Sequence, residues 1–285
     1  MTVNEVYKAY LDGLEKIYSR GEVESIAALV FESMAGINRA AIKKDRDRLL
    51  DVSVVQKLTV SLKKLKLNTP VQYVLGEAWF SDLKFIVSPA VLIPRPETEE
   101  LVLKVINYLK DWSNASLLDI GTGSGCIPIS IKKILPHLKV TAIDKSIEAL
   151  AIARENATIY KTGIDLFQND FLDEAGWNNF PVFDVIVSNP PYIPFGEKEM
   201  IDKNVADFEP AIALFVEDDR PLIFYEKIAR FGKQHLKTGG KIFVETHELF
   251  AEQVDELFEN AGYISSIELD MHGKQRMVIA TRPGQ

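Results

Sequence analysis

Four consecutive residues form the clearest chemical motif in the sequence, and we call them the tetrad: Asn189, Pro190, Pro191 and Tyr192. They follow residues 184–188, a mostly apolar run that predicts a buried strand. Proline lacks the N–H that a central strand needs and holds the preceding residue extended, so the strand must end at Asn189. Because ligands bind beyond the carboxyl ends of strands in an open α/β sheet, the Asn189 amide is expected to contact a ligand. A proline-rich turn without a ligand is the competing interpretation.

A glycine-rich loop follows another predicted strand, residues 116–120, and leads into a helix from about residue 124. We call it the glycine loop, and its residues are Gly121, Thr122, Gly123, Ser124 and Gly125. A glycine turn between a strand and a helix lets ligand atoms approach backbone N–H groups. The nicotinamide dinucleotide fingerprint has the spacing G-x-G-x-x-G, whereas this loop is G-x-G-x-G with Cys126 at the next position. The spacing favours a nucleoside ligand without a pyrophosphate.

Acidic and aromatic residues stand at the tips of the neighbouring predicted strands. Asp144 ends the second strand and can accept hydrogen bonds from both ribose hydroxyls, or it is simply an acid near the start of a helix over residues 146–156. Asp170 and Phe171 follow the third strand and suit an adenine, with the carboxylate for its amine and the ring for its face. Phe171 could equally belong to the core. Asp119, just before the glycine loop, could orient that loop or face an amino group of the ligand.

Length and composition narrow the class of protein. A chain of 285 residues with 47% hydrophobic and 26% charged residues is typical of a soluble globular protein with two domains. No run approaches the apolar length of a membrane-spanning helix, and the first residues lack a signal-peptide pattern, so we expect a cytoplasmic protein without a membrane partner. One cysteine, Cys126, excludes an internal disulfide framework. Four scattered histidines argue against a metal site or a histidine-based triad.

Charge is distributed unevenly along the chain. The net charge of −8 argues against broad binding to nucleic acid. Residues 1–67 hold 12 basic and 9 acidic residues, whereas the remainder holds 21 basic and 32 acidic ones. Most of the N-terminal positive charge lies between Arg39 and Lys66. This basic span is either a solvated helical face or a docking patch for an acidic macromolecular partner.

Composition also divides the chain into three segments. Residues 1–67 lack proline and show apolar positions at helical spacing, which predicts a small N-terminal helical domain. Residues 68–91 contain strand-like runs at 71–76, 79–80 and 83–87, which predict a β-hairpin linker. Residues 92–285 form the predicted third segment, the larger domain. Near its start, residues 94–99 form either a lid near the ligand or only the start of a helix over about 97–109.

From residue 116 onward, predicted strands and helices alternate. The predicted strands cover residues 116–120, 139–143, 164–168, 184–188, 241–245, 264–269 and 277–280. A short turn around His272 joins the last two strands, so they should pair antiparallel. The pattern predicts an α/β fold with a doubly wound, seven-stranded sheet. Strands one and four should flank the point where the strand order reverses, which would place the tetrad beside the glycine loop.

The glycine loop, Asp144 and the tetrad together resemble the S-adenosylmethionine-dependent methyltransferases with a Rossmann-like sheet, in the group that methylates planar nitrogens. Three further stretches, residues 70–77, 92–99 and 208–214, are similar to the peptide chain release factor glutamine N5-methyltransferases. The similarity covers residues 70–285, and the N-terminal helical domain is similar in kind only. At Phe171 a tryptophan is common in the family, and stacking should survive that change.

The resemblance implies the substrate, the cofactor and the partner. The substrate would be the glutamine side chain in the Gly-Gly-Gln loop of translational release factors, and S-adenosylmethionine would donate the methyl group. The glycine loop, Asp144, Phe171 and Asn189 would bind this donor, and the tetrad would hold the glutamine. The N-terminal domain would dock the release factor. No direct contact with nucleic acid is expected, and the protein is expected to act as a monomer.

The residue types suit this chemistry. A glutamine NH₂ offers two donors, which the Asn189 side-chain oxygen and the Pro190 carbonyl can accept, while Tyr192 packs on the flat amide face. This geometry aims the nitrogen at the methyl group, and no general base need be proposed.

Three competing functions use the same residues. A DNA adenine-N6 methyltransferase could bind a flipped adenine with the tetrad, but it would need a basic domain that recognises the DNA target. A binding protein without activity is disfavoured by the intact tetrad and the intact glycine loop. A glutamine methyltransferase that acts on a ribosomal protein differs from the first assignment only in its protein substrate.

Overall fold

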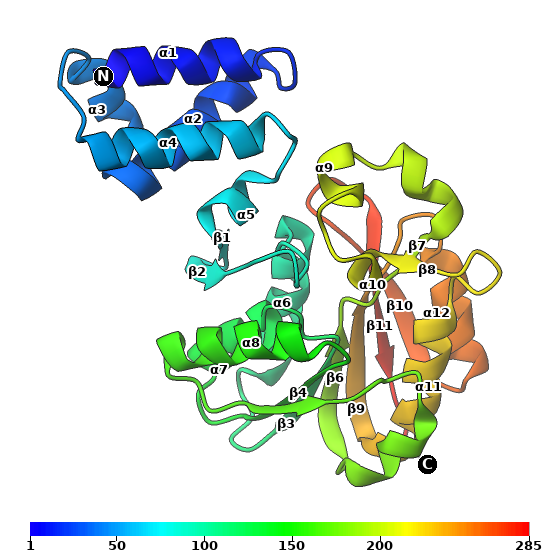
Figure 1. The fold of residues 1–285 in the computed structure, drawn as a ribbon. Helices are drawn as coiled ribbons and strands as arrows, with labels where there is room; N and C mark the ends of the chain where they lie inside the picture. Colours follow the sequence, from blue (N-terminus) through cyan, green and yellow to red (C-terminus); the bar gives the residue numbers. More distant parts are fainter. Residues whose placement is uncertain (285) are drawn as a thin grey trace. The chain divides into compact units, whose positions relative to one another are not determined.

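The computed structural model describes residues 1–284, which Figure 1 shows as a ribbon coloured along the sequence. The described chain forms two compact units. The smaller unit holds Met1–Glu77 together with Asp202–Phe208, and the larger unit holds Ala78–Ile201 and the chain from Glu209 onward. The smaller unit thus reaches ten residues past the predicted end of the helical domain and takes in a short excursion of the later chain.

The smaller unit is helical. Its helices are α1 (Val3–Leu14), α2 (Arg20–Ala35), α3 (Arg39–Lys44), α4 (Val52–Leu65), α5 (Val71–Leu75) and α9 (Lys203–Ala206). Thr2 and Ser19 begin α1 and α2 with capping boxes, in which a glutamate three residues later reaches back to the cap. In the core, the ring of Tyr10 meets that of Phe31 edge-on, and its hydroxyl donates to the Leu58 carbonyl at 2.6 Å.

The predicted strand over residues 71–76 is wrong, because this stretch is helix α5. Pro70 precedes the first turn, where a missing N–H costs nothing, and Gly76 ends the helix in the left-handed conformation at φ 74°. Val74 is buried in the core of the helical unit. Val71, Tyr73 and Val74 are residue types that are common in strands, but the flanking residues and the burial of Val74 favour a single helical turn.

The larger unit is built on a seven-stranded sheet with the order β10-β11-β9-β6-β3-β4-β5. Its strands are β3 (Ser116–Ile120), β4 (Lys139–Asp144), β5 (Asp165–Gln168), β6 (Phe183–Ser188), β9 (Leu236–Glu245), β10 (Ile264–Leu269) and β11 (Gln275–Thr281). Five neighbouring strands of this sheet, β9, β6, β3, β4 and β5, run parallel, and β11 pairs antiparallel with both β9 and β10. The predicted α/β class and all seven predicted strands are confirmed.

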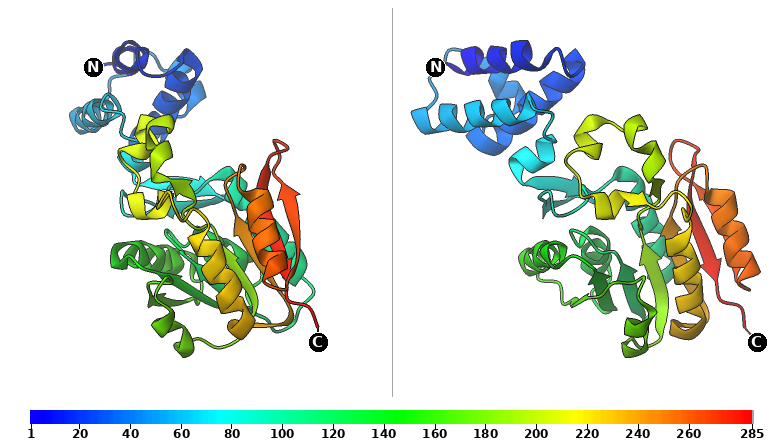
Figure 2. Two further views of the ribbon diagram at one scale, coloured as in Figure 1. Left: turned by 90° about the vertical axis from the view of Figure 1, so that its right-hand side faces the viewer. Right: turned by 45° about the vertical axis from the view of Figure 1, so that its right-hand side comes forward.

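Helices cover both faces of this sheet, as Figures 1 and 2 show. The long helices are α6 (Pro96–Leu109), α7 (Cys126–Ile134), α8 (Ile147–Tyr160), α11 (Ile223–His235) and α12 (Ala251–Asn260). Helices α6, α7 and α8 share one core with Leu117 and Val185, whereas α11 and α12 share the other with Leu118 and Ile186. Neighbouring residues of one strand thus enter opposite cores, as the period-2 alternation of a strand requires.

Shorter elements complete the larger unit. They are the pair β1 (Glu77–Phe80) and β2 (Leu83–Ile86), the pair β7 (Ile193–Pro194) and β8 (Phe215–Val216), the helix α10 (Ala211–Leu214), and the 3₁₀ helices η1 (Glu174–Asn179) and η2 (Phe195–Met200). Strands β1 and β2 are joined through Ser81 and Asp82, both at positive φ. Within residues 1–284 no helix is long and apolar enough to cross a membrane. The same residues contain no cluster of three or more metal-ligating side chains.

Candidate active site

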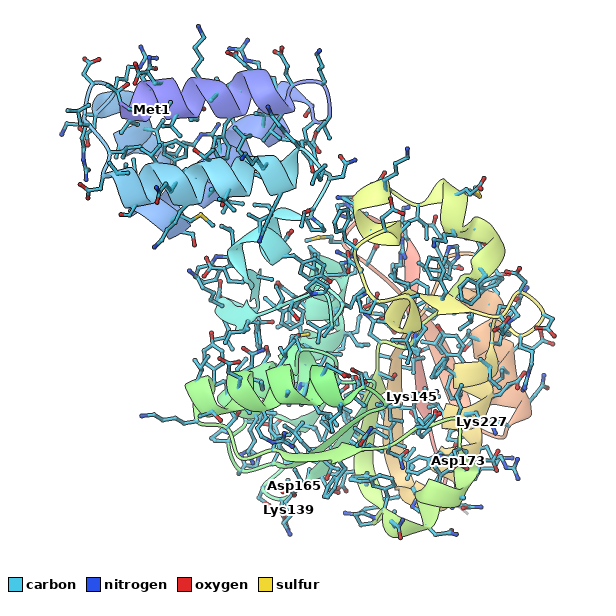
Figure 3. All side chains as sticks on the ribbon, viewed as in Figure 1. Met1, Lys139, Lys145, Asp165, Asp173 and Lys227 are labelled. Carbon is cyan, nitrogen blue, oxygen red and sulfur yellow. The ribbon has the colours of Figure 1, made fainter. Side chains whose placement is uncertain are left out.

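The carboxyl ends of the parallel strands meet in one row, and the predicted site residues stand just beyond it. Figure 3 labels Lys139 at the start of β4 and Lys145 past its end, which gives the direction of these strands. Ser188 of β6 pairs with Ile120 of β3 on one side and with Val244 of β9 on the other. One step further along their strands come Gly121, Asp144, Asn189 and Glu245. The predicted neighbourhood of the glycine loop and the tetrad follows from this register.

The glycine loop faces open space. Gly121 and Gly123 have φ values of 76° and 54°, and a Cβ built on either would meet no atom within 4 Å. The N–H of Gly121 donates to the Ile143 carbonyl at 2.9 Å, which fixes the loop to β4. Gly125 has a different role, because its Cβ would lie 3.2 Å from that of Ala153. Gly125 therefore lets α7 pack closely on α8, while Gly121 and Gly123 leave room for a ligand.

A cavity of about 410 Å³ lies at this edge of the sheet, and its size is in the range of small-molecule sites. Most predicted site residues line it: Gly121, Thr122, Gly123, Ser124, Asp144, Asp170, Phe171, Asn189, Pro190 and Pro191. Much of the remaining wall is apolar and includes Val91, Leu92, Ile212, Phe215 and Phe224. Asp119, Gly125 and Tyr192 do not line the cavity. An apolar cavity with a few convergent polar groups is the usual form of a small-molecule site.

Asp144 binds both the glycine loop and the start of α8. Its Oδ2 accepts from the Gly123 N–H at 2.8 Å, and its Oδ1 accepts from the Ser146 N–H at 2.9 Å. Burial raises the pKa of Asp144, and these N–H donors oppose that rise. The cap of α8 itself is the Ser146 hydroxyl, which accepts from the Ala149 N–H. The carboxylate therefore does more than face a helix start, since it also holds the glycine loop in place at the cavity wall.

Asp170 and Phe171 differ in their surroundings. The Asp170 Oδ2 lies 2.8 Å from the Nζ of Lys145, and both side chains are partly exposed. Phe171 is 5% exposed, and its ring stacks on that of Trp177 with centroids 5.3 Å apart. The indole N–H of Trp177 donates to the Phe171 carbonyl at 3.0 Å. Phe171 is thus a core residue that also forms part of the cavity wall, so the two interpretations of this aromatic are compatible.

Several buried polar groups around the glycine loop form no hydrogen bond of normal geometry within the described chain. They are both carboxylate oxygens of Asp119 and the hydroxyls of Thr122 and Ser124. Burial raises the pKa of Asp119 to about 7; the nearby Thr122 hydroxyl opposes this rise and the charge of Asp144 adds to it. A buried polar group without a hydrogen bond is destabilising, and native structures contain few of them. Since Thr122 and Ser124 line the cavity, a polar ligand there could satisfy their hydroxyls.

Tyr192 and Asn189 of the tetrad are joined through two residues outside it. The Asn189 Nδ2 donates to the Thr98 Oγ1 at 3.0 Å, and the Thr98 hydroxyl donates to the Glu245 Oε2 at 2.6 Å. The Tyr192 hydroxyl donates to the Glu245 Oε1 at 3.2 Å. Sequence reasoning gave no role to Thr98 or Glu245. The available signal was a single acid at the end of an apolar strand, the same signal that identified Asp144.

Residues 94–99 are fixed by a partly buried ion pair. Pro96 opens α6, and Pro94 and Thr98 line the cavity, so this segment is both a helix start and a part of the wall. Arg95 donates to Glu209 at 2.6 Å, and the second oxygen of Glu209 accepts from the Ile93 N–H at 3.0 Å. The pair ties the segment to the chain that leads into α10. Both residues lie in stretches that resemble the family, residues 92–99 and 208–214, but nothing in the sequence predicts that they meet.

Comparison with known proteins assigns the chain to a family. A family model described as the methyltransferase small domain matches residues 99–207. The chain is 38% identical to a release factor glutamine methyltransferase of Flavobacterium psychrophilum over 98% of each protein. It is also 38% identical to one of Bacteroides thetaiotaomicron, over 98% of this chain and 100% of that relative. A solved methyltransferase from Pyrococcus furiosus aligns with a TM-score of 0.48 and 19% identity, over 70% of this chain and 89% of its own. Given the identity to the two relatives along nearly the whole chain, the protein belongs to the family of release factor glutamine methyltransferases.

Proposed function

We propose that this protein transfers a methyl group from S-adenosylmethionine to the side-chain amide nitrogen, N5, of the glutamine in the Gly-Gly-Gln motif of peptide chain release factors. The observation that carries the proposal is the Asn189 side chain at the cavity wall, with its NH₂ already bound by Thr98. Its oxygen is then the end of the amide available to a substrate NH₂. The names of the full-length relatives indicate the same class of acceptor.

The residues around the cavity suit the methyl donor. The open space at Gly121 and Gly123, and the buried hydroxyls of Thr122 and Ser124 at the cavity wall, fit a ligand with polar groups near the glycine loop. Asp144 would accept from the ribose hydroxyls, beside its bond to Gly123. Asp170 and Phe171 would contact the adenine. The donor supplies a methyl group on a positively charged sulfur, which is a strong electrophile.

Positioning is the main task of the residues that face the acceptor. An amide nitrogen is a poor nucleophile because its lone pair is delocalised into the carbonyl. The Asn189 oxygen and the Pro190 carbonyl would accept the two N–H groups of the glutamine, which aims the nitrogen at the methyl group and favours its pyramidal form. Tyr192 would pack on the amide face. The nitrogen is strongly acidic once its lone pair is used, so no side chain has to act as a general base.

The same two acceptors would select glutamine over glutamate. A glutamate carboxylate brings only oxygens to the Asn189 oxygen and the Pro190 carbonyl, with no proton to share. Leaving buried acceptors unpaired costs about 1–3 kcal/mol, and a site built on hydrogen bonds rejects such analogues strongly.

One labelling experiment tests the proposed reaction. The full-length protein receives methyl-labelled S-adenosylmethionine with a release factor, with the same factor carrying Gln→Ala in its Gly-Gly-Gln motif, with ribosomal protein, or with duplex DNA. We expect label on the unaltered release factor alone. Label on DNA would support an adenine methyltransferase instead, and label on ribosomal protein would support a ribosomal-protein methyltransferase. Label retained on the Gln→Ala factor would reject the glutamine as the acceptor.

The helical unit is proposed to dock the release factor outside its Gly-Gly-Gln loop. Helix α4 carries Lys63 and Lys64 in its last turn and exposes the apolar side chains of Val52 and Val60, which are 74% and 53% exposed. Such a mixed basic and apolar surface favours a protein partner. The proposed methylation would take place in the cytoplasm, where a single cysteine without a disulfide partner, such as Cys126, is common.

Charge reversal tests the docking role without removing folded chain. Lys63→Glu with Lys64→Glu should raise the KM for whole release factor several-fold and leave the Kd for S-adenosylmethionine unchanged. The matched control reverses Lys8 and Lys16 of the same unit, which lie outside the basic span. Equal increases in KM for both pairs, or a parallel loss of donor binding, would contradict the docking proposal.

A further inference from the structure

Glu245 occupies an unusual position for a carboxylate. It ends β9 in the core with 2% of its surface exposed, and it lies one residue beyond the pairing of Val244 with Ser188. Each of its two oxygens accepts from a different element: Oε2 from Thr98 of α6, at 2.6 Å, and Oε1 from Tyr192 of the tetrad, at 3.2 Å. A buried carboxylate is costly unless its oxygens are bound, and here both are.

The hydrogen bonds have a fixed direction because Thr98 has one hydroxyl proton. With a carboxylate as its partner, Thr98 must use that proton to donate to Glu245. Towards Asn189 the Thr98 oxygen can then act only as an acceptor. The Asn189 NH₂ must therefore face Thr98, where it lies at 3.0 Å, and the Asn189 oxygen must point elsewhere. The charge on Glu245 thus decides which end of the Asn189 amide is offered to a ligand.

We propose that Glu245 is a positioning residue, whose carboxylate orients the Asn189 amide through Thr98 and anchors the Tyr192 hydroxyl, so that the tetrad presents an acceptor oxygen to the substrate amide. The proposal rests on the proposed glutamine methylation and assigns a residue outside the tetrad to it. Glu245 touches neither substrate nor donor in this scheme, and it does not line the cavity. Its effect is confined to the polarity and placement of Asn189 and Tyr192.

The surroundings of Glu245 support this assignment. Thr98 and Tyr192 account for the hydrogen bonds of its carboxylate, since the Tyr225 hydroxyl donates to the Glu245 main-chain carbonyl at 3.0 Å instead. Glu97 of α6 and Arg276 of β11 are the charged groups that act on it, with opposite signs. Tyr225 therefore offers a matched control, because it is equally buried and binds the same residue at another atom.

The test compares substitutions that change these hydrogen bonds with little change in volume. Glu245→Gln keeps one acceptor oxygen, so Thr98 and Tyr192 cannot both donate to it. Thr98→Val removes the hydroxyl, and Thr98→Ser restores it. Loss of a hydrogen bond to a charged group corresponds to a fall in kcat of about 10–100-fold, which we expect in Glu245→Gln and in Thr98→Val at saturating release factor and donor. Thr98→Ser should recover most of the activity that Thr98→Val loses.

Readouts other than activity separate positioning from a structural role. The Kd for S-adenosylmethionine should stay within about threefold of the wild-type value in each variant, since the glycine loop and Asp144 are unchanged. The combined Glu245→Gln and Thr98→Val variant should be no slower than the slower single variant, because both act through one chain of hydrogen bonds. Tyr225→Phe should lower the free energy of unfolding and leave kcat nearly unchanged.

Three outcomes would overturn the positioning role. They are a kcat of Glu245→Gln close to that of the wild type, additive losses in the combined variant, and a donor Kd that weakens in step with kcat. Failure of the proposed function is distinguishable, because the wild-type protein would then methylate no release factor.

Discussion

The Arg95 guanidinium meets the Glu209 carboxylate at 2.6 Å, across 114 residues of sequence. The Glu209 side chain is 1% exposed and that of Arg95 is 29% exposed. Glu209 also accepts from the Ile93 N–H, so both of its oxygens are occupied. Because Pro94 and Pro210 line the cavity, this ion pair holds two parts of the cavity wall together.

Arg95→Met should therefore destabilise the protein. It leaves a buried carboxylate without its cation, which costs about 3 kcal/mol when the pair is buried. Urea unfolding measures this loss, and calorimetry with S-adenosylmethionine should show weaker binding because Pro94 and Pro210 are no longer held. Lys274→Met is the control, since Lys274 and Glu248 are 49% and 35% exposed, neither lines the cavity, and their pair contributes about 1 kcal/mol or less. Equal losses in the two variants would show that the buried pair has no special role.

Asn189→Ala should separate binding of the donor from turnover. The variant removes the acceptor oxygen that aims the glutamine nitrogen, so kcat should fall by at least about 100-fold. The cavity walls near the glycine loop remain, so the Kd for S-adenosylmethionine should change little. Asn178→Ala, at an exposed asparagine of η1, is the matched control and should leave both quantities unchanged. Full turnover by Asn189→Ala would remove Asn189 from the mechanism.

The parts of the site that follow one strand could be predicted from the sequence. Each strand tip is marked locally, by the glycines after Ile120, by Asp144 and by the prolines after Asn189. A parallel sheet then brings these tips together without further information. The same reasoning placed Phe171 at the cavity but could not decide between core and ligand contact, because one ring does both.

The parts that depend on distant partners could not be predicted. Thr98 and Glu245 are 147 residues apart in sequence, and no local pattern states that their side chains meet. The predicted strand over residues 71–76 is wrong for another reason. The residue types of Val71–Leu75 favour a strand, but the packing of Val74 into the helical core outweighs that preference. Sequence periodicity therefore predicts secondary-structure elements and the residues at strand ends well. It does not predict the hydrogen bonds between side chains of different elements.

Gly123→Ala should weaken donor binding more than it weakens the fold. The left-handed conformation at φ 54° costs a residue with a Cβ about 1 kcal/mol, and the new methyl group would project into open space beside the cavity wall. We expect a Kd for S-adenosylmethionine raised by about tenfold or more, which corresponds to about 1.4 kcal/mol. Isothermal titration measures it directly.

Gly239→Ala is the matched control for this substitution. Gly239 lies in β9 at φ 76°, again with no atom near a built Cβ, and it does not line the cavity. The control should lose similar stability and keep its donor affinity. If both variants bind the donor equally well, the open space at Gly123 is not part of the donor site.

Turnover and stability should respond to pH in opposite directions. Burial raises the pKa of Glu245 from 4.5 to about 7, helped by the charge of Glu97 and opposed by Thr98, Tyr192 and Arg276. The native state therefore holds the proton more tightly than the unfolded chain, so this contribution to stability is complete below 4.5 and is lost as the pH rises through about 7. The ionised carboxylate is the form that forces Thr98 to donate, so kcat should rise as the native Glu245 ionises, around pH 7.

The two effects can be assigned to separate residues. In Glu245→Gln, kcat should no longer rise as the pH passes through 7, where the raised pKa of Glu245 lies. The measurement is made at saturating donor, so that the titration of Asp144 and changes in donor binding do not contribute. Burial also raises the pKa of Asp119 to about 7, so Asp119→Asn should flatten part of the stability profile while the rise in kcat remains. A kcat profile that keeps its rise in Glu245→Gln, or loses it in Asp119→Asn, would transfer the titration from Glu245 to another group.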